Sequence, residues 1–314
     1  MTLWEPEVLA RIRHLALVAR HAVDGVQYGH HPSRALGSSV EFQDYKEYAP
    51  GDPLSQLDWR VAARSDRLVV RRHRAESQLP CWIALDASGD MGTGVTSLGH
   101  DAPRAPLDGS KMGFALCMAA TLSWYLTLQG EPVGLALLGG SGAPWSTLPP
   151  RSGRRHLGRV LGALASVQPA GQADLGGGLS HLAQRMGRSS MVVLISDLME
   201  EPERWGPALR ALGQRRGELR VLHLQDPGEL DLRYPRVARF FSPEGGDSVP
   251  LDPAESREEF RAVVQDWRRE VERLVLAWRG HYLPVSTNRP LSEPLLRLLR
   301  TGSGRGQGRP GGAG

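Results

Sequence analysis

Beyond residue 79, short apolar runs alternate with longer segments in which apolar residues recur every three or four positions. The short runs predict strands at 81–86, 133–139, 191–197, 219–224 and 281–286. The longer segments predict helices near 110–129, 153–167, 176–187, 204–216, 255–279 and 291–299. This alternation is typical of a mostly parallel sheet with helices on both faces, so the pattern predicts an α/β, Rossmann-like fold.

The first part of the chain follows a different pattern. Residues 8–20 have apolar positions at helical spacing, and we expect this helix to pack one face against the rest of the protein. After it, glycines and prolines leave room for only short strands, such as 40–42 and 68–70. The sequence therefore predicts a helix plus a loop- and strand-rich N-terminal module over 1–79 and a sheet domain over 80–300. For residues 301–314 the sequence predicts a disordered, glycine-rich tail.

Several features bear on the membrane and the compartment. The uncharged stretch 112–130 approaches the length of a bilayer span, but it contains polar residues and a strand pattern follows at once, so we expect a helix buried on the sheet. The first residues have neither the basic nor the apolar region of a signal peptide. Cys81 and Cys117 fall within a predicted strand and helix, as small core residues of a reducing compartment do. We expect a cytoplasmic protein with no membrane span.

The balance of charge permits nucleic acid as a partner but does not indicate it. The 38 Lys and Arg residues are nearly offset by 34 Asp and Glu residues, which leaves a formal net charge of +4. Around the arginine-rich segment from Arg60 to Arg74, the residues Asp58, Asp66 and Glu76 are interleaved, and no aromatic residues alternate with the arginines for base stacking. An ion-paired surface or a domain contact is the simpler interpretation, so no nucleic-acid binding is expected.

Acidic residues stand where two of the predicted strands end. Asp86 closes the first strand of the sheet domain, with Ser88 and Asp90 just after it, and Asp197 closes the third. Parallel strands of one sheet end at the same edge, where these side-chain oxygens can converge on one hard cation such as Mg²⁺. An alternative stays open, in which Asp90 caps or solvates the loop toward the next helix and Ser88 bonds to backbone.

No catalytic motif accompanies these carboxylates. Residues 109–111, Gly-Ser-Lys, lack the spacing and the order of a phosphate-binding loop. Residues 178–182 miss the second glycine of a serine-hydrolase elbow and fall within a predicted helix. We therefore expect a protein that is not an enzyme. The alternative is a metal-dependent hydrolase in which Asp86, Asp90 and Asp197 hold an ion that activates water.

A longer motif precedes the first strand of the sheet domain. Residues 40–52 read VEFQDYKEYAPGD, and residues 57–64 read LDWRVAAR. In this order of an aromatic, Pro-Gly-Asp, Asp-Trp and Ala-Arg, continued through 195–197 and 284–287, the chain resembles the DUF58 family. The C-terminal part of that family is similar to a von Willebrand factor A (vWA) domain. The Pro-Gly-Asp and Asp-Trp motifs form either the small core of the N-terminal module or a docking surface.

The resemblance implies a metal-ion-dependent adhesion site. In such sites Asp-x-Ser-x-Ser, a threonine and a distant aspartate hold Mg²⁺, and the protein ligand supplies a further carboxylate. This chain has Asp86, Ser88 and Asp197 at the matching positions, but Asp90 replaces the second serine and Ala173 replaces the threonine. An added carboxylate strengthens the demand for a cation, and water can replace a lost hydroxyl. The expected ligands of an altered Mg²⁺ site are Asp86, Ser88, Asp90 and Asp197.

The resemblance also implies a partner. DUF58 proteins look functionally paired with MoxR-type AAA+ ATPases in chaperone-like or maturation activity. We therefore expect a non-enzymatic adaptor that presents the acidic edge of its sheet to such an ATPase.

Overall fold

The structure is a computed structural model. It describes residues 6–29, 42–48, 61, 64, 68–73, 79–93, 109–140, 145–172, 174–187, 189–215, 217–231, 238–240 and 249–300. The chain forms two compact units, residues 34–78 and residues 1–33 together with 79–314. The division after residue 78 lies next to the predicted boundary at residue 79. The first helix, however, belongs to the same unit as the sheet and not to the N-terminal module.

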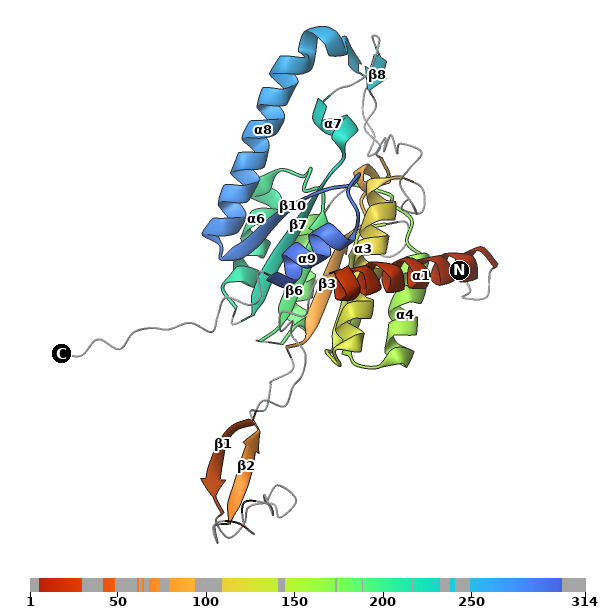
Figure 1. Cartoon of the computed structure of the whole chain (residues 1–314). Coiled ribbons are helices and arrows are strands. Elements are labelled where there is room, and N and C mark those ends of the chain that lie inside the picture. The colour runs from red at the N-terminus through yellow and green to blue at the C-terminus, as the bar shows by residue number, and fades with distance from the viewer. Residues whose placement is uncertain are drawn as a thin grey trace, which may run out of the picture. The chain divides into compact units, whose positions relative to one another are not determined.

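The larger unit is built on a six-stranded sheet (Figure 1). In spatial order, its strands are β10 (Gly280–Ser286), β7 (Glu218–Gln225), β6 (Met191–Ser196), β3 (Cys81–Asp86), β4 (Val133–Leu138) and β5 (Trp145–Arg151). All neighbouring strands are parallel except β4 and β5. Every residue of β3 is buried, as a central strand covered on both faces requires. The predicted α/β fold with a mostly parallel sheet is confirmed, and it is the architecture expected of a vWA-like domain.

The edge strand β5 was not predicted. It carries Pro149 and Pro150, and prolines are confined to edge strands because they cannot donate to a ladder. On the neighbouring strand, a Cβ at Gly134 would lie 2.8 Å from both Leu148 O and Pro150 N, so only glycine lets β5 approach so closely. Prolines normally argue against a strand, so the sequence pattern gave no strand signal here.

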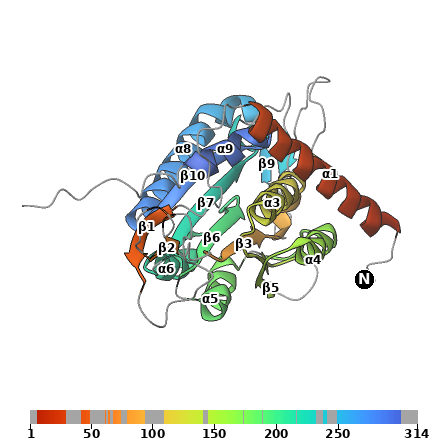
Figure 2. The same cartoon turned by 60° about the horizontal axis from the view of Figure 1, so that its bottom comes forward.

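Helices cover both faces of the sheet (Figure 2). One apolar core contains residues of α1 (Pro6–Gly29), α3 (Lys111–Leu128), α4 (Arg154–Ala165) and α9 (Ser292–Arg300). The other core contains residues of α5 (Leu175–Arg185), α6 (Pro202–Gly213) and α8 (Pro253–Ala277). All six predicted helices of the sheet domain are therefore present, with ends shifted by a few residues.

Fifteen of the 18 residues of α3 are buried, because this helix packs against the sheet and α1 packs across it. Leu15, Ala19 and Val23 of α1 are fully buried in the apolar core that also contains α3. The predictions that the first helix packs against the rest of the chain and that the uncharged stretch is a helix buried on the sheet are thus confirmed. None of the helices in the described ranges has the length and apolar character required to cross a membrane.

In the smaller unit, the described residues form one antiparallel pair of strands. The strands are β1 (Phe42–Glu47) and β2 (Val69–His73), which overlap the predicted short strands but extend further. The Pro-Gly-Asp and Asp-Trp motifs lie outside the described residues, as does the predicted tail over 301–314.

Four further short elements lie in the described part of the larger unit. They are the 3₁₀ helix η2 (Gly89–Gly92), the helix α7 (Pro227–Asp231) and the antiparallel strands β8 (Ala238–Phe240) and β9 (Val249–Leu251). None was predicted, because three to five residues carry too little periodicity to be recognised. Two of them, η2 and α7, follow strands at the carboxyl edge of the sheet and contribute to the candidate site.

Candidate functional site at the carboxyl edge of the sheet

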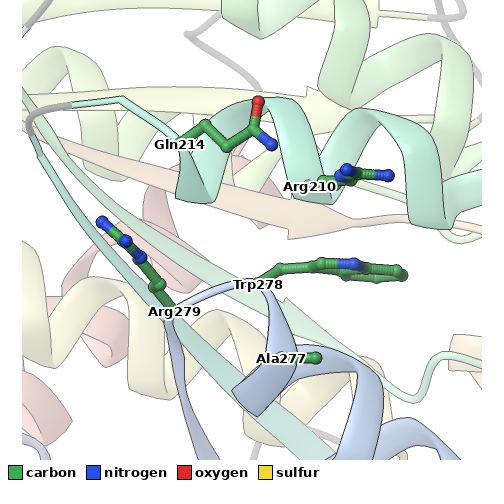
Figure 3. Close-up of a pocket in the computed structure, with 5 residues that line it drawn as sticks. All are labelled: Arg210, Gln214, Ala277, Trp278 and Arg279. Atoms are coloured by element: carbon green, nitrogen blue, oxygen red, sulfur yellow. The ribbon is translucent and has the colours of Figure 1, made fainter.

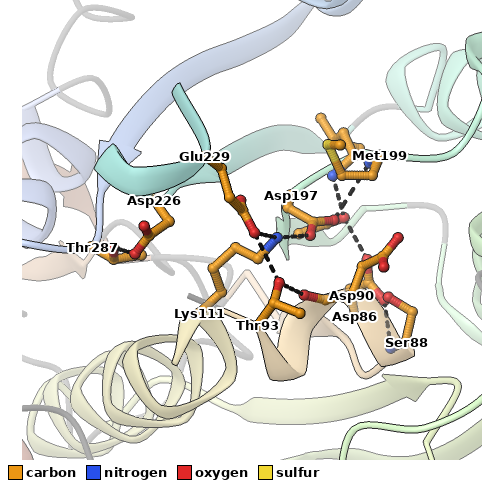
Figure 4. Close-up of polar contacts among 12 residues, drawn as sticks. Asp86, Ser88, Asp90, Thr93, Lys111, Asp197, Met199, Asp226, Glu229 and Thr287 are labelled. Atoms are coloured by element: carbon orange, nitrogen blue, oxygen red, sulfur yellow. Dashed lines mark hydrogen bonds and ion pairs between the residues drawn. The ribbon is translucent and has the colours of Figure 1, made fainter. Parts of the chain in front are cut away.

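The sheet brings the predicted carboxylates together. Strands β3 and β6 are parallel neighbours in which Leu85 pairs with Ile195, so Asp86 and Asp197 both emerge at the same edge. The helix η2, directly after β3, adds Asp90 to this edge (Figure 4). The negative charge of Asp197 acts on both Asp86 and Asp90. The sequence therefore predicted correctly that these carboxylates lie together at one edge of the sheet. Their binding of a metal ion stays a prediction.

Asp86 is held by hydrogen bonds on both of its oxygens. The hydroxyl of Ser196 donates to Oδ2 at 2.6 Å, and the backbone N–H of Ser88 donates to Oδ1 at 3.0 Å. Complete burial and the nearby charge of Asp197 raise the pKa of Asp86 to about 7, although the bonds from Ser196 and Ser88 oppose this rise. Asp86 is thus a structural acceptor with a strongly disfavoured charge.

Lys111 places a positive charge inside the cluster. Its side chain is 1% exposed, and Nζ lies 2.7 Å from Oδ2 of Asp197 and 2.8 Å from Oε1 of Glu229. Burial by itself lowers the pKa of Lys111, but the charges of Asp197 and Glu229 outweigh that effect and leave the pKa raised. Lys111 is therefore an ammonium ion shared by two carboxylates.

Glu229 connects the helix α7 to this network. The hydroxyl of Thr93 lies 2.8 Å from Oε1 of Glu229 and 2.6 Å from the backbone oxygen of Asp90, so its one proton serves either acceptor. The start of α7 is anchored by Asp226, which accepts from the N–H of Gly228 at 2.8 Å. These contacts tie α7 to the first turn of α3 and to η2 (Figure 4).

Asp90 lies half-buried at the rim of the cluster. Burial and the charge of Asp197 raise its pKa, and the charge of Lys111 lowers it. Ser88, the residue before η2, makes no side-chain cap on that helix, and its hydroxyl instead stabilises the charged form of Asp86. The alternative in which Asp90 caps or solvates this loop and Ser88 bonds to backbone stays a prediction.

A sharp turn after β6 exposes an apolar side chain beside the cluster. Leu198 has φ of 54°, a left-handed conformation that is uncommon for a non-glycine residue, and its side chain is fully buried. The hydroxyl of Ser196 accepts its N–H at 2.9 Å, which helps to hold the turn. Because Leu198 turns inward, Met199 projects outward and is 57% exposed.

The side chains as arranged do not fit a divalent metal ion. Among the residues that the structure describes, no group of three or more His, Cys, Asp or Glu is placed to hold one. Mg²⁺ needs near-octahedral oxygen ligands, but the ammonium of Lys111 contacts the Asp197 oxygen that such an ion would use. The Mg²⁺ site of Asp86, Ser88, Asp90 and Asp197 stays a prediction that requires Lys111 to move. Ala173 lies outside the described residues.

Sequence reasoning missed Lys111, Glu229 and Thr93. For Lys111 a signal existed, since it directly precedes the uncharged stretch as the first residue of α3, where the helix dipole disfavours a cation. A lysine in such a place needs nearby acidic partners. Glu229 and Thr93 gave no such signal, because only the folded chain brings α7 and the end of η2 to this lysine.

A cavity of about 430 Å³ lies elsewhere on the molecule. It is lined by Arg210, Gln214, Ala277, Trp278 and Arg279, at the C-terminal ends of α6 and α8 (Figure 3). These helix ends precede β7 and β10, so the cavity sits toward the amino edge of the sheet and is not part of the acidic cluster.

Comparison with known proteins assigns the family. The model of the family described as "Protein of unknown function DUF58" matches residues 44–270. The chain belongs to the DUF58 family. This DUF58 chain is 27% identical over 302 residues to the uncharacterized proteins Rv1480 of Mycobacterium tuberculosis and Mb1516 of Mycobacterium bovis, with 94% of this chain and 90% of each relative covered.

Two solved structures resemble this DUF58 chain at low sequence identity. An aerotolerance-related membrane protein from Bacteroides fragilis is 14% identical, with 71% of this chain and 99% of that chain covered and a TM-score of 0.45. The SpRpn10 VWA domain is 12% identical, with 74% and 100% covered and a TM-score of 0.37.

Proposed function

We propose that this DUF58 chain is a non-enzymatic protein-interaction adaptor that binds its partner with the carboxyl edge of the sheet. The observation that carries the proposal is the exposure of Met199 beside a closed charge network. Methionine adapts to varied contact shapes, and an apolar centre with a charged rim is the usual anatomy of a protein interface. Met199 adjoins the acidic cluster, because its N–H donates to Oδ1 of Asp197 at 3.4 Å. The partly exposed carboxylates of the same cluster are Asp90, half-buried, and Glu229, whose side chain is 35% exposed.

We propose a non-enzymatic role because the polar groups beside Asp86 are already engaged in structural hydrogen bonds. The Ser196 hydroxyl donates to Asp86 and accepts from the Leu198 N–H, so it already serves two structural bonds. An activated nucleophile instead needs an adjacent base that is free to take its proton. Nothing in this arrangement favours the metal-dependent hydrolase as a second candidate, because the ammonium of Lys111 contacts Asp197.

The proposed partner is a MoxR-type AAA+ ATPase, with which the chain would act in chaperone-like or maturation activity. The chain belongs to the DUF58 family, and the choice of partner rests on the pairing with such ATPases that this family resemblance implies. In the described structure, the partner would contact Met199 and the carboxylates around it, so charge and apolar area both contribute to recognition.

The experiment is a capture assay with a MoxR-type ATPase from the same organism. The variant Met199→Asp places a charge at the centre of the proposed surface, and we expect capture to fall by about tenfold or more. Leu276→Asp is the matched control, because Leu276 is 56% exposed and lies at the C-terminal end of α8, outside the proposed surface. Equal capture of the wild type and both variants would contradict the proposed surface.

A further inference from the structure

The geometry points to Lys111 as the resident cation of this site: its ammonium takes the place of a divalent metal ion, and the carboxyl edge is complete without metal. This inference concerns the same edge as the proposed function, but it stands on contacts within the chain. The cation that balances the carboxylates is then a side chain of the protein itself.

The position of Lys111 makes the case. Its side chain is buried at the first turn of α3, which is an unfavourable place for a positive charge because both desolvation and the helix dipole oppose it. Such a charge persists only where paired carboxylates compensate for it. Asp197 and Glu229 do so from two other segments, at 2.7 and 2.8 Å from Nζ. An ammonium that collects carboxylates from different segments performs the structural task of a bound cation.

The charges around Lys111 support the same conclusion. Asp86, Asp90 and Asp197 lie at one edge, where their mutual repulsion requires a cation or a proton. Lys111 compensates part of this charge through its contact with Asp197. A Mg²⁺ ion at the same carboxylates would lie next to the ammonium, and the two cations would repel each other at short distance in a buried setting. The site therefore accommodates either Lys111 or a divalent ion, and the wild-type chain carries the lysine.

Exchanging the two cations provides the test. In the full chain, calorimetric titration with Mg²⁺ is expected to show no binding, and neither Mg²⁺ nor EDTA is expected to shift Tm. The variant Lys111→Ala removes the ammonium and leaves the carboxylates, so it should gain Mg²⁺ binding. The Tm of this variant should rise by roughly 5 °C when the Mg²⁺ concentration is 100 times the Kd of the variant for Mg²⁺.

A double variant controls for weak binding elsewhere on the surface. Lys111→Ala combined with Asp197→Asn lacks the carboxylate that both cations share, so the gained Mg²⁺ binding should be lost. If Lys111→Ala does not fold in EDTA, it should recover its fold in Mg²⁺ but not in NaCl of equal ionic strength, because binding to the folded state alone stabilises it.

The inference is overturned by Mg²⁺ binding to the wild type, or by a Lys111→Ala variant that neither binds Mg²⁺ nor is rescued by it. No partner protein enters these measurements. A failed capture assay would therefore reject the proposed function and leave the assignment of Lys111 intact, whereas Mg²⁺ binding by the wild type would reject this assignment alone.

Discussion

At the scale of single residues, the two carboxylates on Lys111 differ in how much water reaches them. The side chain of Asp197 is 4% exposed and that of Glu229 is 35% exposed. Removing the charge of a buried partner leaves a buried ion uncompensated, so Asp197→Asn should lower the free energy of unfolding by about 3 kcal/mol. Glu229→Gln keeps an acceptor oxygen at a more solvent-exposed position and should lower the free energy of unfolding by about 1 kcal/mol. Urea denaturation of both variants measures the difference, and equal losses would contradict the argument that solvent exposure sets the cost of removing each carboxylate.

His223 on β7 gives the residue-scale prediction for pH. Burial and then the charge of Arg268 lower its pKa to about 3, and its ring lies 2.7 Å from the Tyr282 hydroxyl. The unfolded chain gains a proton on this histidine near pH 6.5, and the folded chain does not. The stability that neutral His223 contributes is therefore present above pH 6.5 and is lost as pH falls toward 3, by up to about 1.4 kcal/mol per pH unit.

The measurement for His223 is the pH dependence of unfolding in urea. The difference in stability between the wild type and His223→Asn should shrink steadily from pH 7 to pH 4.5, because the asparagine does not titrate. Any constant loss of packing only offsets the two curves. Curves that stay parallel over this range would show that His223 takes up its proton in the folded state as well.

At the scale of elements, the contact between α6 and α8 depends on one glycine. Gly213 ends α6, and a Cβ there would overlap the backbone oxygen of Trp278. Gly213→Ala should therefore destabilise the protein by about 2 kcal/mol, since a backbone atom cannot give way cheaply. Gly158 on α4 is the matched control, because it is exposed and a Cβ there meets nothing within 4 Å. Gly158→Ala should instead stabilise by about 1 kcal/mol through helix propensity.

Thermal unfolding of the two glycine variants separates packing from propensity. Gly213→Ala is expected to lower Tm, and Gly158→Ala is expected to raise it. A rise in both would mean that α6 and α8 are further apart than the close approach of Gly213 and Trp278 requires.

The elements also show what the sequence could and could not predict. Strands β3 and β6 and the buried helix α3 were predicted because long apolar runs and helical periodicity report burial directly. Strand β5 was missed because its prolines fit only at an edge, beside Gly134. The acidic cluster was located from strand ends. The ion pairs of Lys111 were not, because they join segments whose proximity only the fold determines.

At the scale of the whole molecule, the helix α1 and the segment 34–78 belong to different compact units although they are neighbours in the sequence. Leu15, Ala19 and Val23 of α1 are fully buried in the core that also contains α3. Each large buried aliphatic side chain contributes about 1.5–3 kcal/mol, so the sheet unit depends on α1 for a substantial part of its stability.

Two shortened chains test this dependence at the same scale. A chain that begins at residue 79 lacks α1 and exposes the apolar surface of α3, so we expect it to aggregate or to unfold at a much lower temperature. A chain that keeps α1 and replaces 34–78 by a flexible Gly-Ser linker of equal length should retain a cooperative transition close to that of the full chain. If both chains lose the transition, the segment 34–78 supports the sheet unit after all. If both keep it, the burial of α1 contributes little, and α3 must tolerate solvent on its outer side.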